Sequence, residues 1–470
     1  MFSQYFQTLQ NCLKVGELRS RIFFTLALLV VCRVVAMTPI PGLDGQELLT
    51  FFDELRKQQD SGAGGGAGLL GMYSMFTGGA LERCAVGSLG IMPYISATII
   101  LQLMTAVVPS LSKIAREEGG RTQIIKYGRY LTVLLCLGQG FVMSIGWENP
   151  QNIPGFGQFD GQLVADPGLW YRIRTMLLLT TGTVLLMWLG EQISERGIGN
   201  GISLVITVGI IARVPQAVLG LKEMFLPQTG EASHPFNGVM LVVLLFSVVG
   251  VVIAVTQAMR KIPVQYAQRQ VGRKMMQGGS TYFPLRVNYA GVMPIIFAQA
   301  LLMFPAQIFG TLGRWLGDGS FGEFVQGLGD ALAYGSFWNL AMQSLMILFF
   351  SYFWVATQFN ETQISDDLKK AGGYIPGVRP GNATRDFLHH AMSRLTLAGA
   401  MFLVIIAVIP TVMMINFDIP FTVAQYFGGT SLLIMVGVML DTMRQVESHL
   451  AQHHYDGFLK GGKKVRGRAG

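Results

Sequence analysis

Ten long apolar segments run through the chain, and they constrain its fold more than any other feature. Each is close to the roughly 20 residues that an α-helix needs to cross the hydrocarbon core of a bilayer. With 51% hydrophobic and only 13% charged residues, the chain falls outside the range of soluble globular proteins. The sequence therefore predicts an all-α polytopic membrane protein with ten transmembrane helices, near residues 22–40, 85–108, 130–147, 172–190, 201–219, 238–259, 290–310, 338–359, 395–415 and 423–441.

Positive charges gather in alternate connections between these segments. One set of five stretches carries 25 lysines and arginines, whereas the other five carry 4. The basic set consists of residues 1–21, 109–129, 260–289, 360–394 and 442–470. Cytoplasmic connections of membrane proteins carry the excess of Lys and Arg. We therefore expect the N-terminus (1–21) and the basic tail (442–470) to lie together in the cytoplasm.

The segment around residues 73–84 is too short and too rich in glycine to cross a bilayer. It leads into an apolar helix that contains Pro93, Ser96, Thr98 and Gln102. Backbone groups freed by such breaks are tolerated at membrane depth only where protein or an aqueous cavity satisfies them. The pattern is typical of a pathway through the membrane, and a short surface helix or a re-entrant segment fits the short stretch equally well.

The turn at Gly190–Ser203, between the fourth and fifth apolar segments, carries four glycines and several polar side chains. Glycine can take positive φ, and polar side chains can cap helix ends. The sequence predicts a tight, well-capped turn here.

Two of the basic connections have patterns of their own. Residues 260–289 contain six basic residues and no acid, which fits a topological anchor or a contact with an acidic partner such as ribosomal RNA. Residues 360–394 balance bases with acids, and their Pro/Gly turn presents Arg379 at a tip. A solvated arginine and a partner contact both remain open for Arg379.

These motifs resemble the SecY family of protein translocase channels over nearly the whole chain. The matching stretches are Pro39–Asp44, Phe76–Leu103, Trp188–Ser203, Tyr266–Pro284, Asn288–Phe297, Asp367–Gly381 and Phe427–Ile434. The resemblance implies two inverted five-helix halves, at 22–219 and 238–441, around a central pore with a lateral gate towards lipid.

The resemblance also implies roles for individual residues. It places a ring of aliphatic side chains at the pore constriction, where apolar groups exclude ions: Ile91, Ile95, Ile202, Ile206, Ile296 and Ile434. It places a plug over residues 72–82, namely Met72, Tyr73, Ser74, Met75, Phe76, Thr77, Gly78, Gly79, Ala80, Leu81 and Glu82. Ser96, Gln102 and Asn288 fall near the lateral gate, where ordinary hydrogen bonding between helices also accounts for them.

Partners are implied in the same way. The basic residues Arg269, Arg273 and Lys274, together with Arg379, match surfaces that dock the SecA motor ATPase or the ribosome, including its rRNA. SecE and SecG would be the small membrane subunits, preproteins the substrate, and membrane lipid the destination of hydrophobic segments. The family lies in the bacterial plasma (inner) membrane.

The expected function is therefore a passive channel of the general secretory translocase rather than an enzyme. The sequence has no GxxxxGK[ST] nucleotide site, so energy would come from a bound motor or a ribosome. No cofactor and no metal are expected, because Cys12, Cys32, Cys84 and Cys136 have no close spacing. The alternative is a secondary transporter of small solutes, but transporters place ionisable groups at mid-membrane and Arg33 is the clearest one here.

Overall fold

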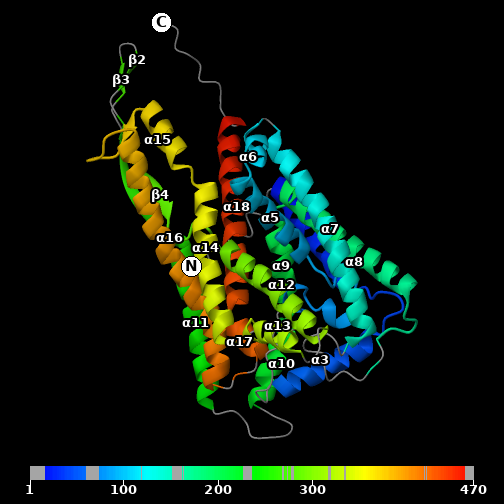
Figure 1. The fold of residues 1–470 in the computed structure, drawn as a ribbon. Helices are drawn as coiled ribbons and strands as arrows, with labels where there is room; N and C mark the ends of the chain where they lie inside the picture. The colour runs from blue at the N-terminus through cyan, green and yellow to red at the C-terminus, as the bar shows by residue number, and fades with distance from the viewer. Residues whose placement is uncertain are drawn as a thin grey trace. The chain divides into compact units, whose positions relative to one another are not determined.

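The computed structural model describes residues 16–59, 74–117, 119–150, 161, 163–225, 235–266, 269–271, 274–276, 280–315, 319–332, 335–417, 419 and 421–460 (Figure 1). The chain divides into two compact units. Unit 1 comprises residues 1–56, 70–215 and 438–470, and unit 2 comprises residues 57–69 and 216–437. Each unit is described separately below.

Unit 1 contains most of the first half of the chain. Its elements are α2 (Gly16–Met37), α3 (Gly45–Gln59, up to Arg56), the 3-10 turn η1 (Leu81–Arg83), α5 (Met92–Val107), α6 (Pro109–Arg116), α7 (Gly120–Glu148), α8 (Leu169–Arg196) and α9 (Gly201–Ile211). Helices α7 and α8 lie side by side as a long hairpin (Figure 1). The last part of α18 (Thr430–Lys460) also belongs to unit 1.

The start of α2 and the last part of α18 lie at the same end of unit 1. Leu18 and Ile198 are buried together, and Val446 and Leu450 pack against them. The backbone N–H of Gly199 donates to Oε1 of Gln445 at 2.9 Å. The start of α2 is therefore packed against the later part of α18.

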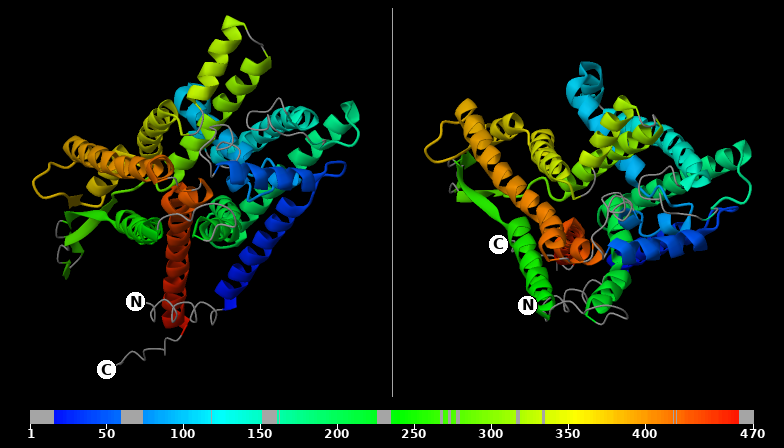
Figure 2. Two further views of the ribbon diagram at one scale, coloured as in Figure 1. Left: turned by 90° about the horizontal axis from the view of Figure 1, so that it is seen from below. Right: turned by 60° about the horizontal axis from the view of Figure 1, so that its bottom comes forward.

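Unit 2 contains the remaining helices and all the strands. Its elements are α10 (Val214–Phe225, from Gln216 on), α11 (Pro235–Gln257), β1 (Met259–Tyr266), β2 (Arg269–Val271), β3 (Lys274–Met276), β4 (Ser280–Arg286), α12 (Met293–Trp315), α13 (Ser320–Ala331), α14 (Phe337–Gln358), α15 (Glu361–Lys370), β5 (Gly373–Tyr374), α16 (Asn382–Phe417), α17 (Phe421–Gly428) and the start of α18. Helices α12 and α13 lie side by side (Figure 2).

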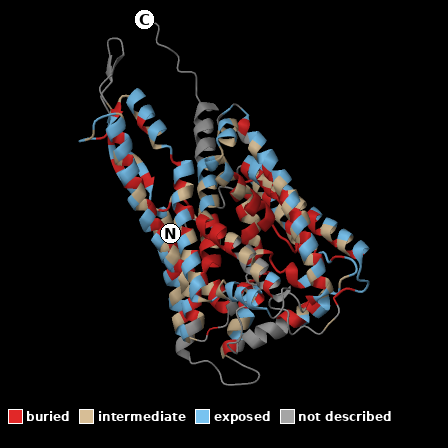
Figure 3. Cartoon of the chain, viewed as in Figure 1, coloured by how far each residue is buried: buried red, intermediate tan, exposed pale blue. Residues whose placement is uncertain are grey.

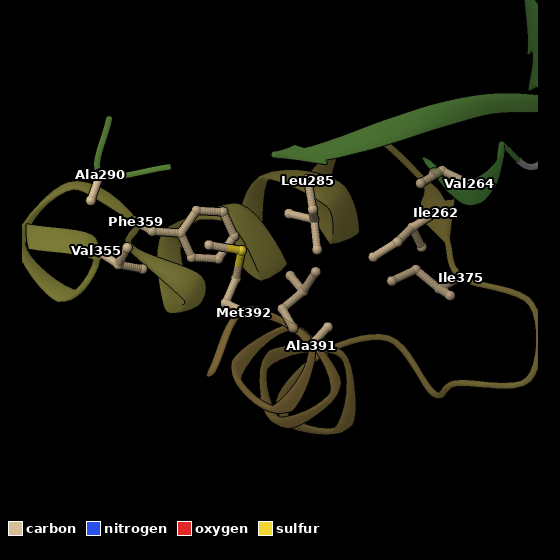
Figure 4. Packing of buried hydrophobic residues seen from close by; sticks show 10 residues of the cluster. Ile262, Val264, Leu285, Ala290, Val355, Phe359, Ile375, Ala391 and Met392 are labelled. Carbon is tan, nitrogen blue, oxygen red and sulfur yellow. The ribbon is translucent and has the colours of Figure 1, made fainter. Parts of the chain in front are cut away.

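A small antiparallel sheet, with strand order β4-β1-β5, interrupts the helices of unit 2. Its buried face carries Ile262, Val264 and Leu285, which pack with Ile375 and with residues of α14 and α16 (Figure 4). Strand β1 alternates buried and exposed residues along its second half, as expected for a strand with one covered face. The sequence prediction treated 260–289 as a loop, so it missed this sheet.

Apolar side chains on the outside of the helices show that the surroundings are lipid rather than water. Helix α11 has a mean hydropathy of 3.0 over its most apolar stretch, yet only 17% of that stretch is buried. Val239, Val243 and Phe246 are all more than 60% exposed. Exposed faces also run along α7 and α8, whereas buried residues gather in α17 and the first part of α18 (Figure 3). The architecture is that of a polytopic α-helical membrane protein.

Among the described residues, eight helices are long and apolar enough to cross a membrane, or nine if a bent pair counts as one span. The bent pair is α5 and α6, and the chain bends by 104° between them. Helix α12 covers most of the predicted span near 290–310 but is not among these candidates. The count is consistent with ten predicted spans without matching it exactly.

Two predicted boundaries differ from the structure for local reasons. The span predicted to begin at residue 85 becomes helical only at Met92, because Gly90 takes φ +60° in the turn before it. Pro93 lies in the first turn of α5, where its missing N–H costs nothing. The helix predicted at 201–219 is broken after Ile211, and α10 begins at Val214. Pro215 is the second residue of α10, and Arg213 lies between the two helices.

Candidate functional site: the segment before α5

The predicted plug is a short, mostly buried segment of unit 1. Ser74–Phe76 form one helical turn, residues 77–80 form turns, and Leu81 opens η1. All nine residues from Ser74 to Glu82 are buried except Met75 and Phe76. Met72 and Tyr73, the first two predicted plug residues, lie outside the described residues. We call Ser74–Glu82 the plug segment; its role as a plug stays a prediction.

Backbone hydrogen bonds tie the chain just after the plug segment to the end of α2. Ile40 N–H donates to the carbonyl of Cys84 at 2.9 Å, and Val86 N–H donates to the carbonyl of Thr38 at 2.9 Å. Residue Cys84 has φ +46°, and no other described residue apart from glycine has positive φ. This end of the segment is therefore fixed by main-chain pairing.

A buried polar cluster contacts the plug segment from the other side. Arg213 Nη2 lies 2.5 Å from Glu82 Oε1, and the same nitrogen donates to Ser74 Oγ. Ser74 Oγ donates in turn to Glu82 Oε1 at 2.7 Å. The side chains of Arg213 and Glu82 are 9% and 3% exposed. The cluster thus joins the two ends of the plug segment to Arg213, the second residue after α9.

Arg33 of α2 makes a second contact with the plug segment. Its Nη1 donates to the carbonyl of Gly78 at 3.1 Å. The sequence prediction noted Arg33 as an isolated intramembrane charge and did not single out Arg213. The available signal was one arginine in the apolar run 201–219 and one acid in the plug, but nothing in the sequence paired them.

The predicted pore-ring isoleucines are divided between the two units. Ile91, Ile95, Ile202 and Ile206 belong to unit 1, and all except Ile202 are buried. In unit 2, Ile296 on α12 and Ile434 on α18 are buried, and a hydrogen bond from Gln299 Nε2 to Thr430 Oγ1 at 3.0 Å joins their helices about one turn away. That these six residues form one ring stays a prediction.

The predicted gate residues also fall in different units. Ser96 of α5 is 9% exposed, and its hydroxyl has no hydrogen-bond partner among the described residues. Gln102 is half-buried. Asn288 of unit 2 is buried and donates to the carbonyl of Gly291 at 3.1 Å, within its own turn. The gating role of these residues remains a prediction.

The structure joins the two predicted docking connections in one sheet. Residues Gln265 and Tyr374 are paired across β1 and β5, and the Tyr374 hydroxyl donates to Gln265 Oε1 at 2.9 Å. Exposed Arg260, Lys261 and Arg286 lie on the adjoining β1–β4 pair. Arg379 follows β5 on an exposed turn, and its carbonyl accepts from Thr384 Oγ1 at 2.9 Å.

The hairpin of β2 and β3 extends the same basic connection. Arg269 pairs with Met276 and Val271 pairs with Lys274. Arg269 and Lys274 are thus placed on neighbouring strands, while Arg273 lies outside the described residues. Their docking role remains a prediction.

The predicted turn at Gly190–Ser203 is confirmed as a capped helix connection. Asn200 is the N-cap of α9, and its side chain accepts from Ser203 N–H at 3.4 Å. Ser194 Oγ accepts from Gly201 N–H at 2.9 Å. Gly199 takes φ +91°, as the glycine content predicted.

Comparison with known proteins assigns the chain to a family. The SecY family model matches residues 85–443. The chain is 39% identical over 462 residues to the protein translocase subunit SecY of Chlamydia muridarum, covering 96% of this chain and 98% of that one. Two solved structures are similar in fold, each covering 92% of both chains. One reports that the plug domain of the SecY protein stabilises the closed state of the translocation channel (TM-score 0.57, 17% identity). The other is the channel of the canine ribosome–channel complex (TM-score 0.55, 16% identity). The match over nearly the whole length of both sequences shows that the chain belongs to the SecY family.

Proposed function

We propose that this chain is the channel-forming subunit of the general secretory translocase. It conducts unfolded preproteins across the bacterial plasma membrane and releases hydrophobic segments sideways into lipid. The observation that carries this proposal is the 39% identity to a protein translocase subunit over 96% of the chain. Neither the family model nor the relatives described above support the alternative of solute transport.

The geometry fits a passive conduit. The plug segment and the turn before α5 are short helical turns and irregular chain inside a unit of long helices, and they are hydrogen-bonded to Arg33, Arg213 and the chain at the end of α2. Such chain is tolerated at membrane depth only where protein or an aqueous cavity surrounds it. We infer that the isoleucine ring lines the constriction beneath the plug segment, where apolar side chains keep ions out.

The energy for transport comes from a docked partner, either the SecA motor or a translating ribosome. The sheet of β1, β4 and β5 supports this inference, because it carries exposed basic residues and the Arg379 turn on one apolar core. A rigid basic surface suits both an acidic protein face and the phosphates of rRNA. SecE and SecG are the small subunits that complete the channel. The charge asymmetry of the loops supports a cytoplasmic location for both termini.

Site-specific photocrosslinking tests the conduit directly. A photoreactive residue at position 206 is combined with a radiolabelled preprotein stalled halfway through transport. We expect a crosslink that forms only with the stalled chain. The matched control is a probe at Val243, on the lipid-exposed face of α11, which should crosslink to lipid but not to the preprotein. Equal crosslinking from both positions, or none from 206 while transport proceeds, would contradict the conduit.

A further inference from the structure

The plug segment has two kinds of attachment, and they differ in how they can be broken. Its C-terminal end runs into Cys84–Val86, which main-chain hydrogen bonds hold against Thr38 and Ile40. Its remaining part is held from outside by side chains: Arg33 and Arg213, together with the Ser88 hydroxyl, which donates to the carbonyl of Ala80 at 3.0 Å. Side-chain contacts can break without disturbing secondary structure, whereas main-chain pairing cannot. The segment is therefore built to turn about residues 84–86.

The contact between Glu82 and Arg213 is charged and buried, so each of the two charges depends on the other. A buried carboxylate or guanidinium is tolerated only when it is paired and hydrogen-bonded. Glu82 accepts from both Arg213 and Ser74, and Arg213 also donates to Ser74, so the three buried side chains are linked through one carboxylate oxygen and one hydroxyl. Separating the two charged side chains is costly unless water can reach and hydrate both of them.

The position of Arg213 links this contact to α9. Arg213 is the second residue after Ile211, where α9 ends, and its backbone N–H donates to the carbonyl of Ile210 at 3.0 Å. The same short helix carries Ile202 and Ile206. A displacement of α9 must therefore move both Arg213 and these two isoleucines.

Close packing adds a second condition on this position. Gly78 takes φ +65°, and a Cβ added there would lie 2.5 Å from Arg33 Nη1 and 2.9 Å from the Cα of Gly209 on α9. The plug segment thus packs directly against α9 at a point where both segments have a glycine. The plug segment therefore packs against α9 at Gly209 and forms its ion pair with Arg213, just beyond the end of the same helix.

We infer that the buried Glu82–Arg213 ion pair, with Ser74 between its partners, is a latch that holds the plug segment in its resting position and releases it when α9 moves. The inference rests on the proposed function, because it gives the plug segment a mechanism of release. It assigns a positioning role to Arg213, which lies outside the predicted plug.

The test measures exposure of the plug segment in the assembled complex in lipid nanodiscs. The four native cysteines are replaced and Thr77→Cys, a buried position, reports reaction with a water-soluble maleimide. The variants are Glu82→Gln, Arg213→Gln, the milder Ser74→Ala and the double replacement Glu82→Leu with Arg213→Leu. The control is Glu191→Gln, which removes one charge from the α7–α8 ion pair with Arg129. Preprotein transport is measured on the same samples.

We expect either single charge removal to raise the labelling rate at least about tenfold, the change that about 1.4 kcal/mol produces. Ser74→Ala should raise it less, and the double replacement should return it towards the parent value because no unpaired charge remains. Glu191→Gln should leave it unchanged. Unchanged labelling in Glu82→Gln and Ser74→Ala would overturn the latch even if Arg213→Gln fails to assemble. If the parent protein does not transport preprotein, the proposed function fails instead, which is a separate result.

Discussion

Arg172 and Glu148 close one end of the α7–α8 hairpin: the Nε and Nη2 atoms of Arg172 both donate to Glu148 Oε2, at 2.8 and 2.6 Å. At the opposite end, Arg129 Nη2 lies 2.8 Å from Glu191 Oε2. The two pairs are nineteen residues apart on both helices, which corresponds to roughly 28 Å at 1.5 Å per residue. This is close to the thickness of a hydrocarbon core. The ion pairs therefore fix the register of the hairpin near the two faces of the bilayer.

The two ends of the hairpin should differ in their contribution to stability. Glu148 is 4% exposed and also accepts from Gly168 N–H, whereas Glu191 is 15% exposed and its partner Arg129 is nearly half exposed. We expect Glu148→Gln to lower the apparent unfolding temperature by a few degrees and Glu191→Gln to lower it less, because solvent weakens exposed pairs. Thermal unfolding in detergent, followed by tryptophan fluorescence, checks this. Equal losses would count against the role of burial.

Gly78→Ala should displace the plug segment. The added methyl group meets α9 at Gly209 and strains a backbone with positive φ, so the segment cannot keep its position. We predict a higher resting ion conductance in planar bilayers. Gly138→Ala is the control, because a Cβ there meets nothing within 4 Å. A conductance as low as that of Gly138→Ala would contradict the close packing described above.

Replacing Ile91 and Ile206 with asparagine should raise the resting ion leak. Both side chains are buried, at 3% and 2% exposure. In a hydrophobic constriction, polar side chains favour wetting and hence ion passage. The same replacement at Val243, on the exposed face of α11, should leave the leak unchanged. If the leak does not rise in either isoleucine variant, these residues do not line the constriction.

Arg379→Glu should impair motor-driven export much more than assembly of the channel. The side chain is exposed on its turn, and exposed substitutions usually change stability by no more than about 0.5 kcal/mol. Its loss should therefore appear in docking. Export into membrane vesicles and recovery of the purified complex give the two readouts. Arg385→Glu, at another exposed arginine of the same connection, is the control. Equal loss of export and assembly would argue for a structural role.

Cys84 should be unreactive towards alkylating reagents at neutral and mildly alkaline pH. Burial raises the pKa of its thiol to about 12, with a smaller contribution from Asp44. Because only a minute fraction of the thiol is thiolate well below that pH, alkylation should stay far slower than that of an exposed cysteine between pH 7 and 9. Because the folded state favours the neutral Cys84 thiol, the protein keeps its full stability below the ordinary thiol pKa and loses stability as pH rises towards 12.

The measurement for Cys84 uses a variant in which the other three cysteines are replaced. A cysteine at position 320, an exposed residue at the start of α13, provides the comparison and should react faster at pH 9 than at pH 7. Cys84 should react far more slowly than this residue at both pH values, and a comparable rate at Cys84 would show that water reaches this thiol in the resting protein.

Much of the membrane architecture follows from the sequence, because lipid imposes simple rules on length and charge. Apolar runs of about 20 residues predicted the helices, and the glycines of the 190–203 turn predicted its positive φ at Gly199. Local sequence was a weaker guide where helices break. Pro93 suggested an interrupted helix, whereas the structure places it in the first turn of α5.

The sequence by itself determined that this chain crosses a membrane repeatedly. It also determined that the segment around residues 73–84, before α5, is too short to cross one. Only the tertiary structure paired Glu82 with Arg213 and joined the turn of Arg379 to the basic strand β1 through β5. These partners are far apart along the chain, and each residue taken alone has an ordinary explanation as a solvated or anchoring charge. Hydropathy and charge act locally and can be read along the sequence. Ion pairing and strand pairing depend on which segments meet in space, and that is decided only when the whole unit packs.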